Sequence, residues 1–168
     1  MLSHESIADI ANISLSLTFL VGLVVGYAQI KAAARDRRER LTLETLRVFQ
    51  SYNFAELMHF VFSDTMPKTR EELNALPPHE RIMFTQYAQI MESLGILVAG
   101  RFIDIELVDK TIGSLVTMTW KRYELIYSAF MRERDPYVAE YFQWLAERMD
   151  ERLSKNPREP FYKTPDWE

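Results

Sequence analysis

Cationic side chains lie next to aromatic ones along one long predicted helix, in the stretches TWKRY at residues 119–123 and MRER at residues 131–134. Guanidinium forks beside aromatic faces suit the recognition of phosphates and bases. With an arginine in the preceding loop, the pattern predicts five ligand-binding cations: Arg101, Lys121, Arg122, Arg132 and Arg134. The alternative interpretation is a solvated helix face with Trp120 and Tyr123 in the core.

A second pattern with chemical potential is Glu56-x-x-His59, the i, i+3 half-motif of di-iron carboxylate bundles. Such sites need a second copy and two more inward carboxylates, and the sequence has no second copy. We therefore expect no metal site and interpret His59 as a satisfied histidine at a helix interface. No GxxxxGK[ST], GxGxxG or GxSxG motif occurs, so the sequence identifies no catalytic residue and no cofactor, and we do not expect an enzyme.

The composition sets the class of protein that must position these residues. The chain has 168 residues, 48% hydrophobic and 26% charged, with a formal net charge of -4. These fractions exclude a wholly disordered or collagen-like chain, and the length suits one domain. The chain contains no cysteine, which excludes disulfides, thiolate nucleophiles and Cys-based metal sites.

The apolar residues concentrate near the start of the chain. Residues 10–30, IANISLSLTFLVGLVVGYAQI, carry no charge, and a helix of this length measures about 31 Å, the thickness of a bilayer core. A cleavable signal peptide is the alternative, but residues 1–9 contain Glu5 and Asp9 and no basic residue. The sequence therefore predicts a retained transmembrane helix.

Basic residues follow this stretch directly, within residues 31–40: Lys31, Arg35, Arg37, Arg38 and Arg40. The positive-inside bias then predicts a short external N-terminus at residues 1–9, a single span in a bacterial inner membrane, and a cytoplasmic remainder. The same cations lie where anionic lipid headgroups would bind them, each contributing about 1 kcal/mol. Duplex DNA is not an expected partner, because residues 41–168 hold 15 basic and 20 acidic residues.

The predicted span has three different faces. A lipid-facing arc is aliphatic: Ile13, Leu17, Leu20, Val21, Val24 and Ala28. A small-residue stripe at i, i+4 spacing lets helix backbones approach closely: Ser14, Thr18, Gly22 and Gly26. A third arc carries polar groups and would face an axis: Asn12, Ser16, Phe19 and Leu23.

Polar side chains in a membrane are costly unless they face another helix or water. We therefore expect self-association, as a homotetramer, with the third arc lining a pore. The alternative is a tightly packed bundle of helices that does not conduct ions.

The remainder of the chain has helical periodicity throughout, so the predicted fold class is all-α: one membrane helix continuous with a cytoplasmic bundle of about five helices. The continuous helix runs to Phe49, and Asn53 caps the next one. Thr69 opens a short helix with Glu72 as a capping box, and further helices run from Pro78 to Gly100, from Asp104 to about Arg134 and from Pro136. The helical domain covers residues 41–154, and a Pro-rich arm follows at residues 155–168.

Three blocks of the sequence carry a resemblance to a known family: Glu92-Ser93-Leu94-Gly95, Asp104 to Val108, and Trp144-Leu145. With the span and its basic flank, residues 32–153 resemble the bacterial proteins grouped as Domain of Unknown Function 4760. That family implies no catalytic residues. The layout also resembles membrane effectors of bacterial antiviral systems, in which an oligoadenylate binds a cytosolic domain and the membrane part becomes permeable.

These observations lead to two hypotheses of different classes. The first is a homo-oligomeric ion channel or membrane-permeabilising protein that a cytoplasmic oligonucleotide signal gates in antiviral defence. The second is a membrane-tethered adaptor that recruits a protein partner and conducts nothing. A hydrolase with scattered carboxylates is a third and weaker hypothesis.

Overall fold

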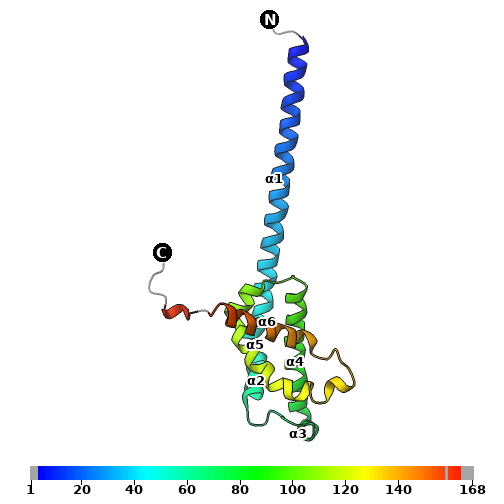
Figure 1. The fold of residues 1–168 in the computed structure, drawn as a ribbon, viewed down its shortest axis with the longest axis vertical. Coiled ribbons are helices and arrows are strands. Elements are labelled where there is room, and N and C mark those ends of the chain that lie inside the picture. The colour runs from blue at the N-terminus through cyan, green and yellow to red at the C-terminus, as the bar shows by residue number, and fades with distance from the viewer. Residues whose placement is uncertain (1–3, 158, 164–168) are drawn as a thin grey trace. The chain divides into compact units, whose positions relative to one another are not determined.

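The computed structural model describes residues 4–157 and 159–163, and side chains from Asn12 onward. Helices account for all regular structure in this part of the chain, and no strand occurs in it, which confirms the all-α class (Figure 1). The helices are α1 (His4–Arg47), α2 (Tyr52–Phe62), α3 (Arg70–Ala75), α4 (Pro78–Ala99), α5 (Ile105–Tyr127) and α6 (Glu140–Lys155), with 3-10 turns η1 (Val48–Gln50), η2 (Met131–Glu133) and η3 (Phe161–Lys163). The chain divides into two compact units, residues 1–40 and residues 41–168.

Helix α1 is a single uninterrupted helix of 44 residues that passes through the boundary between the two units. Neither glycine nor proline occurs between residues 27 and 47, so no residue interrupts its hydrogen-bond ladder. The predicted continuity of the span with the cytoplasmic helix is thereby confirmed, although the α-helix ends at Arg47 and η1 completes the predicted stretch.

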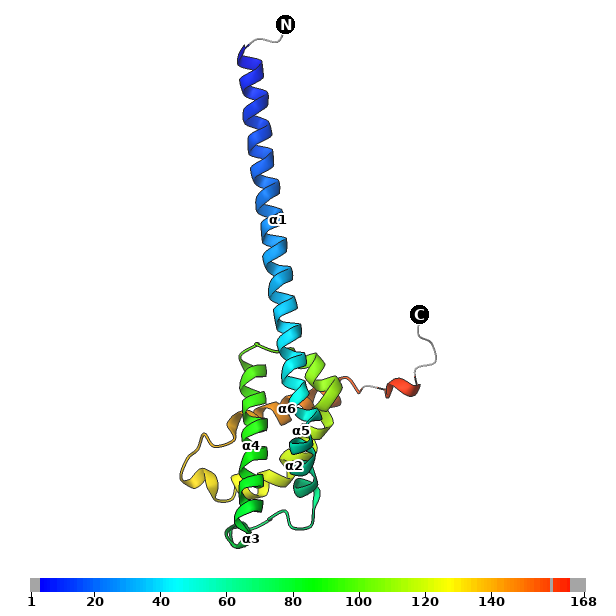
Figure 2. The same ribbon diagram turned by 180° about the vertical axis from the view of Figure 1, so that it is seen from behind.

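The second unit, residues 41–168, which we call the body, is built around α4. Helices α2 and α6 both pack on α4, and α6 also packs on α5 (Figures 1 and 2). Aromatic rings fill the space between these helices: Tyr123 stacks on Phe84 with 4.7 Å between ring centroids and on Tyr87 with 5.6 Å, and Phe142 of α6 packs edge-on against Trp120. Such ring pairs stabilise a core beyond the area that they bury.

The tyrosine hydroxyls in this core have hydrogen-bond partners. Tyr87 donates to Thr119 Oγ1 at 3.0 Å, and Tyr123 donates to the carbonyl oxygen of Phe84 at 3.0 Å. Buried polar groups without partners would be costly, so these bonds fix which faces of α4 and α5 approach each other.

Several predicted helix ends are confirmed. Thr69 Oγ1 accepts from the Glu72 amide at 3.2 Å, although the Glu72 carboxylate returns to the amide of Lys68 rather than of Thr69. Pro78 opens α4, and Asp104 caps α5 by accepting from the Glu106 amide at 2.7 Å. Each of these signals is local, because a side chain binds the first turn that directly follows it.

Three other predicted ends are wrong. Ser51, not Asn53, caps α2 by accepting from the Phe54 amide at 3.1 Å. Helix α5 ends at Tyr127 rather than near Arg134, and the chain continues in turns and in η2. Helix α6 begins at Glu140 rather than at Pro136.

The late start of α6 has a local cause in the preceding segment. Asp135 Oδ1 accepts from the Tyr137 amide at 3.0 Å, and Ala139 takes a left-handed conformation with φ of 56°. An Asx turn and a left-handed residue both interrupt α-helical geometry, so the helix can start only after Ala139.

Candidate functional site

The hydroxyl groups of the predicted span bond to its own backbone. Ser16 Oγ donates to the carbonyl oxygen of Asn12 at 2.9 Å, and Thr18 Oγ1 donates to that of Ser14 at 2.8 Å. The hydroxyl protons are thus satisfied within one helix, and the oxygen lone pairs are left to face outward. These residues therefore need a neighbouring helix less than their polarity alone suggests.

The two glycines of the span face open space in the single chain. A Cβ atom added at Gly22 or Gly26 would meet nothing within 4 Å. The other residues of the predicted arcs, including Phe19 and Leu23, are exposed as well. The small-residue stripe is thus available to another helix, while its use in packing and the pore-lining role of the third arc stay predictions.

The basic flank lies on the turns of α1 that precede the body in the sequence. Lys31, Arg35, Arg37 and Arg40 are exposed and Arg38 is half-buried. Arg35 pairs with Glu39, with 2.9 Å between Nε and Oε1. An exposed pair of this kind contributes little to stability, so the predicted binding of lipid headgroups is compatible with it.

The end of α1 is held to the start of α5 by a buried hydroxyl. Thr42 is fully buried, and its Oγ1 accepts from the Asp104 amide at 2.9 Å. Leu46, one turn later, is buried too. Asp104 therefore both caps α5 and joins it to α1, a link that the sequence analysis missed because it connects residues 62 positions apart.

Two of the five predicted ligand-binding cations make internal contacts. The Arg122 guanidinium donates to the carbonyl oxygen of Val61 at 3.0 Å and lies over the Phe62 ring, 5.1 Å from its centroid. The Arg132 guanidinium lies over the Trp120 ring and donates to three oxygens in the segment before and within α6: Val138 O at 3.2 Å, Ala139 O at 3.3 Å and Gln143 Oε1. Both side chains thus organise the body itself.

The other three cations, Arg101, Lys121 and Arg134, are exposed but are not gathered at one place. Arg101 precedes α5, whereas Lys121 lies 16 residues after Ile105, about 24 Å along that helix. The structure therefore does not bring the five predicted residues into a single site.

Arg101 also has an unusual backbone conformation, with φ of 59°. Its amide donates to the carbonyl of Val98 at 3.0 Å and the Phe102 amide donates to that of Leu97 at 2.9 Å, which together form a Schellman motif. The predicted end of α4 at Gly100 is confirmed, but the left-handed residue is Arg101. A Cβ at position 100 would lie 2.6 Å from the ring of Phe102, so this exposed ring would have to move to admit a side chain there.

The Glu92 to Gly95 block receives the first turn of α6. The Glu92 carboxylate accepts from the amides of Phe142 at 2.8 Å and Tyr141 at 3.3 Å, and so caps a helix whose own N-cap residue, Ala139, has no side-chain acceptor. A Cβ at Gly95 would lie 2.3 Å from the Tyr141 carbonyl oxygen, so the close approach of α4 and α6 requires a glycine here. The block is therefore the surface of α4 on which the first turn of α6 packs.

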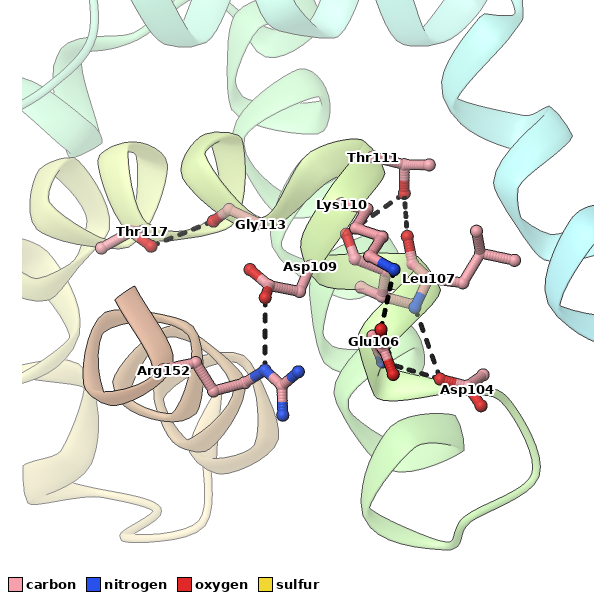
Figure 3. Close-up of polar contacts among 10 residues, drawn as sticks. Asp104, Glu106, Leu107, Asp109, Lys110, Thr111, Gly113, Thr117 and Arg152 are labelled. Atoms are coloured by element: carbon pink, nitrogen blue, oxygen red, sulfur yellow. Dashed lines mark hydrogen bonds and ion pairs between the residues drawn. The ribbon is translucent and has the colours of Figure 1, made fainter. Parts of the chain in front are cut away.

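A second polar contact fixes the other end of α6. Arg152 points at Asp109 of α5, with 3.2 Å between Nε and Oδ2 (Figure 3). The two groups are partly exposed, so the bond contributes to position more than to stability. Together with Glu92, it holds α6 across both α4 and α5.

Glu56 and His59 are both exposed on α2, so the predicted interfacial environment of His59 is wrong. With His79 and Glu80 of α4 they line an open pocket of about 610 Å³. Within residues 4–157 and 159–163, no three His, Cys, Asp or Glu side chains lie so that they could hold a metal ion.

A groove that the sequence analysis did not anticipate lies between the end of α1 and α4, with a volume of about 390 Å³. It is lined by Thr45, Val48, Phe49, Gln86, Gln89, Ile90, Ser93, Leu94 and Leu97. None of these residues is charged, so the groove suits an apolar or amide-bearing surface rather than an anion.

Comparison with known proteins gives a single family. Neither the curated proteins nor the solved structures contain a match to this chain. The family model described as Domain of unknown function (DUF4760) matches residues 16–149. The matched region contains most of the predicted span, the hydrogen bond between Thr42 and Asp104, and the Glu92 to Gly95 block. The chain therefore belongs to the DUF4760 family.

Proposed function

We propose that the protein is a homo-oligomeric membrane effector in which several copies of α1 surround an ion-conducting axis and the body controls its opening. The observation that carries this proposal is the continuity of α1. A helix of residues 4–47 contains both the apolar stretch and the buried anchor at Thr42. A simple membrane anchor needs no such continuity.

The part of α1 between the apolar stretch and the anchor at Thr42 is short and uninterrupted. Thr42 lies twelve positions after Ile30, about 18 Å along the helix, and none of the eleven residues between them is glycine or proline. A continuous α-helix resists bending unless its hydrogen bonds are broken. A rotation of the body at Thr42 is therefore transmitted to the membrane stretch, and shifts the equilibrium between closed and open assemblies.

The faces of the span support an axis. The lone pairs of Ser16 and the side chain of Asn12 share one arc with Phe19 and Leu23, so that a polar ring and an apolar constriction follow each other along it. Gly22 and Gly26 on the adjacent stripe allow close helix contacts. The apolar constriction is the natural gate.

The proposed signal is a cytoplasmic oligonucleotide, by resemblance of layout to bacterial antiviral effectors. Among the predicted contacts, Arg101, Lys121 and Arg134 are the cations whose side chains are exposed. Arg122 and Arg132 are engaged internally and would contribute by holding the body together. The proposed location is a bacterial inner membrane with the body in the cytoplasm.

The experiment is ion flux from vesicles that contain the full chain, measured with and without oligoadenylates. We expect flux that depends on the nucleotide. Absence of flux under every nucleotide condition would remove the channel.

A variant with a weakened helix between the apolar stretch and Thr42 tests whether α1 transmits movement of the body. Replacing Ala32, Ala33 and Ala34 by glycine weakens the helix by about 3 kcal/mol, whereas replacing them by leucine keeps it. The glycine variant should conduct without dependence on the body, and the leucine variant should behave like the parent protein. Equal behaviour of the two variants would contradict transmission through α1.

A membrane-tethered adaptor is the second candidate, and the uncharged groove beside Phe49 favours it. This candidate requires only that the body stay at the membrane. Replacing residues 10–30 by polyleucine should then leave the protein functional, whereas the channel would lose its activity.

A further inference from the structure

The outer face of α4 carries no charge over most of its length. Between Ile82 and Ala99 the only charged residue is Glu92, and its carboxylate is bound to the first turn of α6. The exposed residues recur at three- and four-residue spacing and so form one continuous stripe: Ile82, Thr85, Gln89, Ser93 and Ile96. We call these five residues the α4 face.

The α4 face combines exposed aliphatic groups with neutral polar groups. Ile82 is 62% exposed and Ile96 is 46% exposed. Arg81, beside the start of the face, donates to the carbonyl oxygens of Asn74 and Leu76. An exposed helix face of a globular domain is usually charged, so this stripe is exceptional for a surface that water covers.

The groove beside the end of α1 extends this face sideways. Gln89 and Ser93 belong both to the face and to the groove, which continues over Ile90 and Leu97 to Val48. The whole surface is therefore apolar at its base, and the polar groups that line it are amides and hydroxyls.

We infer that the α4 face binds the α4 face of a second copy of this chain. Gln, Ser and Thr side chains both donate and accept hydrogen bonds, so such a face is complementary to itself. A partner with a charged surface would leave its charges unpaired here, at a cost of several kcal/mol. A face that binds itself joins copies two by two around a two-fold axis.

The area of the face fits copies that are already held together. From Ile82 to Ile96 the face extends fourteen positions along the helix and forms a strip of about 21 by 10 Å, well below the roughly 800 Å² per partner of a stable free-standing interface. Copies whose spans share a membrane have a high effective concentration, so a small face suffices for them. In this respect the inference rests on the oligomer of the proposed function.

The test uses a matched pair of cysteine variants of the full chain, which has no native cysteine. Ser93→Cys lies on the α4 face and Ser114→Cys on the exposed side of α5, and both replace an exposed helical serine. In membranes treated with a short bismaleimide, we expect at least about tenfold more cross-linked dimer from Ser93→Cys, because paired faces raise the local concentration of their thiols.

Equal cross-linking from the two variants, or none from Ser93→Cys and none from Gln89→Cys, would overturn the inference. A cross-linked product that contains a different protein would overturn it as well. Near-ultraviolet circular dichroism of each variant verifies that the body is folded.

Like charges introduced on the α4 face give a second test. In a Gln89→Cys background, Ser93→Lys places two like charges within the paired faces and should lower cross-linking by at least about tenfold, whereas Ser114→Lys should not. No difference between the two lysine variants would contradict pairing through this face.

A cysteine in the span separates this inference from the proposed function. If Gly22→Cys cross-links and the face variants do not, the α4 face is not an interface and the membrane oligomer stands. If the face variants cross-link and vesicles show no flux with any nucleotide, the channel is lost and the interface stands.

Discussion

Helices α1 and α4 both contain long apolar stretches, but the surroundings of the two stretches differ. Both are long and apolar enough to cross a membrane by length and composition. In α4, 44% of the 18 residues that form its most apolar stretch are buried in the body, whereas none of the 18 residues of the corresponding stretch of α1 is buried. Hydropathy describes the side chains of a helix, and only the neighbours of that helix decide which solvent it requires.

The glycines of the two helices differ in the same way. Gly26 of α1 has open space around its Cα, and Gly95 of α4 touches the backbone of α6. The polar groups follow this division too, since Ser16 bonds within its own helix while Glu92 bonds to a helix nearly fifty residues away. Within the described residues Gly26 therefore has no packing neighbour, whereas α4 packs on α6 and α2.

The strongest way to test this contrast is a pair of glycine substitutions. Gly95→Ala places a methyl group against the Tyr141 carbonyl, so we expect the body to lose about 3 kcal/mol of unfolding free energy. Gly26→Ala meets no atom within 4 Å and improves helix propensity, so the body should unfold as in the parent protein. Urea unfolding of the full chain in detergent, followed by near-ultraviolet circular dichroism, measures both; equal loss in the two variants would refute the contrast.

Removing the cap of α6 should have the next largest effect. Glu92→Ala leaves the amides of Tyr141 and Phe142 without their acceptor and should cost about 2 kcal/mol. Glu124→Ala, which removes an exposed carboxylate from α5, should change the same unfolding free energy by less than about 0.5 kcal/mol. A loss no greater than that of this control would show that α6 does not depend on Glu92.

Alkaline pH should destabilise the body through its buried phenols. Burial raises the pKa of Tyr127 to about 12, with a smaller contribution from the negative charge of Glu92, and burial also raises the pKa values of Tyr87 and Tyr123. Each phenol keeps its proton in the folded state while the unfolded chain loses it above about pH 10, so stability falls with rising pH by up to about 1.4 kcal/mol per unit for each tyrosine.

The pH dependence of the unfolding free energy also measures the contribution of a single phenol, that of Tyr127. Between pH 8 and pH 11, Tyr127→Phe should lose about 1 kcal/mol less unfolding free energy than the parent protein does. Tyr137→Phe, at an exposed position, should follow the parent protein. Parallel pH profiles for Tyr127→Phe and the parent would contradict burial of the Tyr127 phenol.

The smallest predicted effect concerns Arg101. Glycine adopts a positive φ without steric cost, so Arg101→Gly should raise the unfolding free energy by about 1 kcal/mol or less. Lys121→Gly, inside α5, should lower it by about 1 kcal/mol. A decrease for Arg101→Gly would mean that the arginine side chain contributes more to the fold than its backbone conformation costs.

Local sequence signals predicted the helix ends that depend on neighbouring residues. Thr69, Pro78 and Asp104 act on the turn that directly follows them, so a single sequence suffices to identify them. The start of α6 depends instead on Glu92, which precedes it by about fifty positions, and on the left-handed Ala139. No local pattern reports such a contact.

The candidate site shows the same limit. Cations next to aromatic residues predicted a ligand surface, but Arg122 and Arg132 bind carbonyl oxygens of the body and lie over its rings. An arginine beside an aromatic residue has the same pattern whether its guanidinium meets a phosphate or a backbone carbonyl. The α4 face was missed because most of the hydrophobic residues in that helix are buried, and their helical spacing hides the few that are exposed.

The sequence by itself determined the all-α class, the charge-free stretch of residues 10–30 and the unbroken helix that follows it, because composition and period fix these properties along one segment. The tertiary structure alone decided that Thr42 anchors α1, that Glu92 and Gly95 receive α6, and that the outer face of α4 stays uncovered. The physical reason is that burial and hydrogen bonding between distant segments depend on which surfaces meet, and pairings of that kind leave no mark on the local spacing of residues.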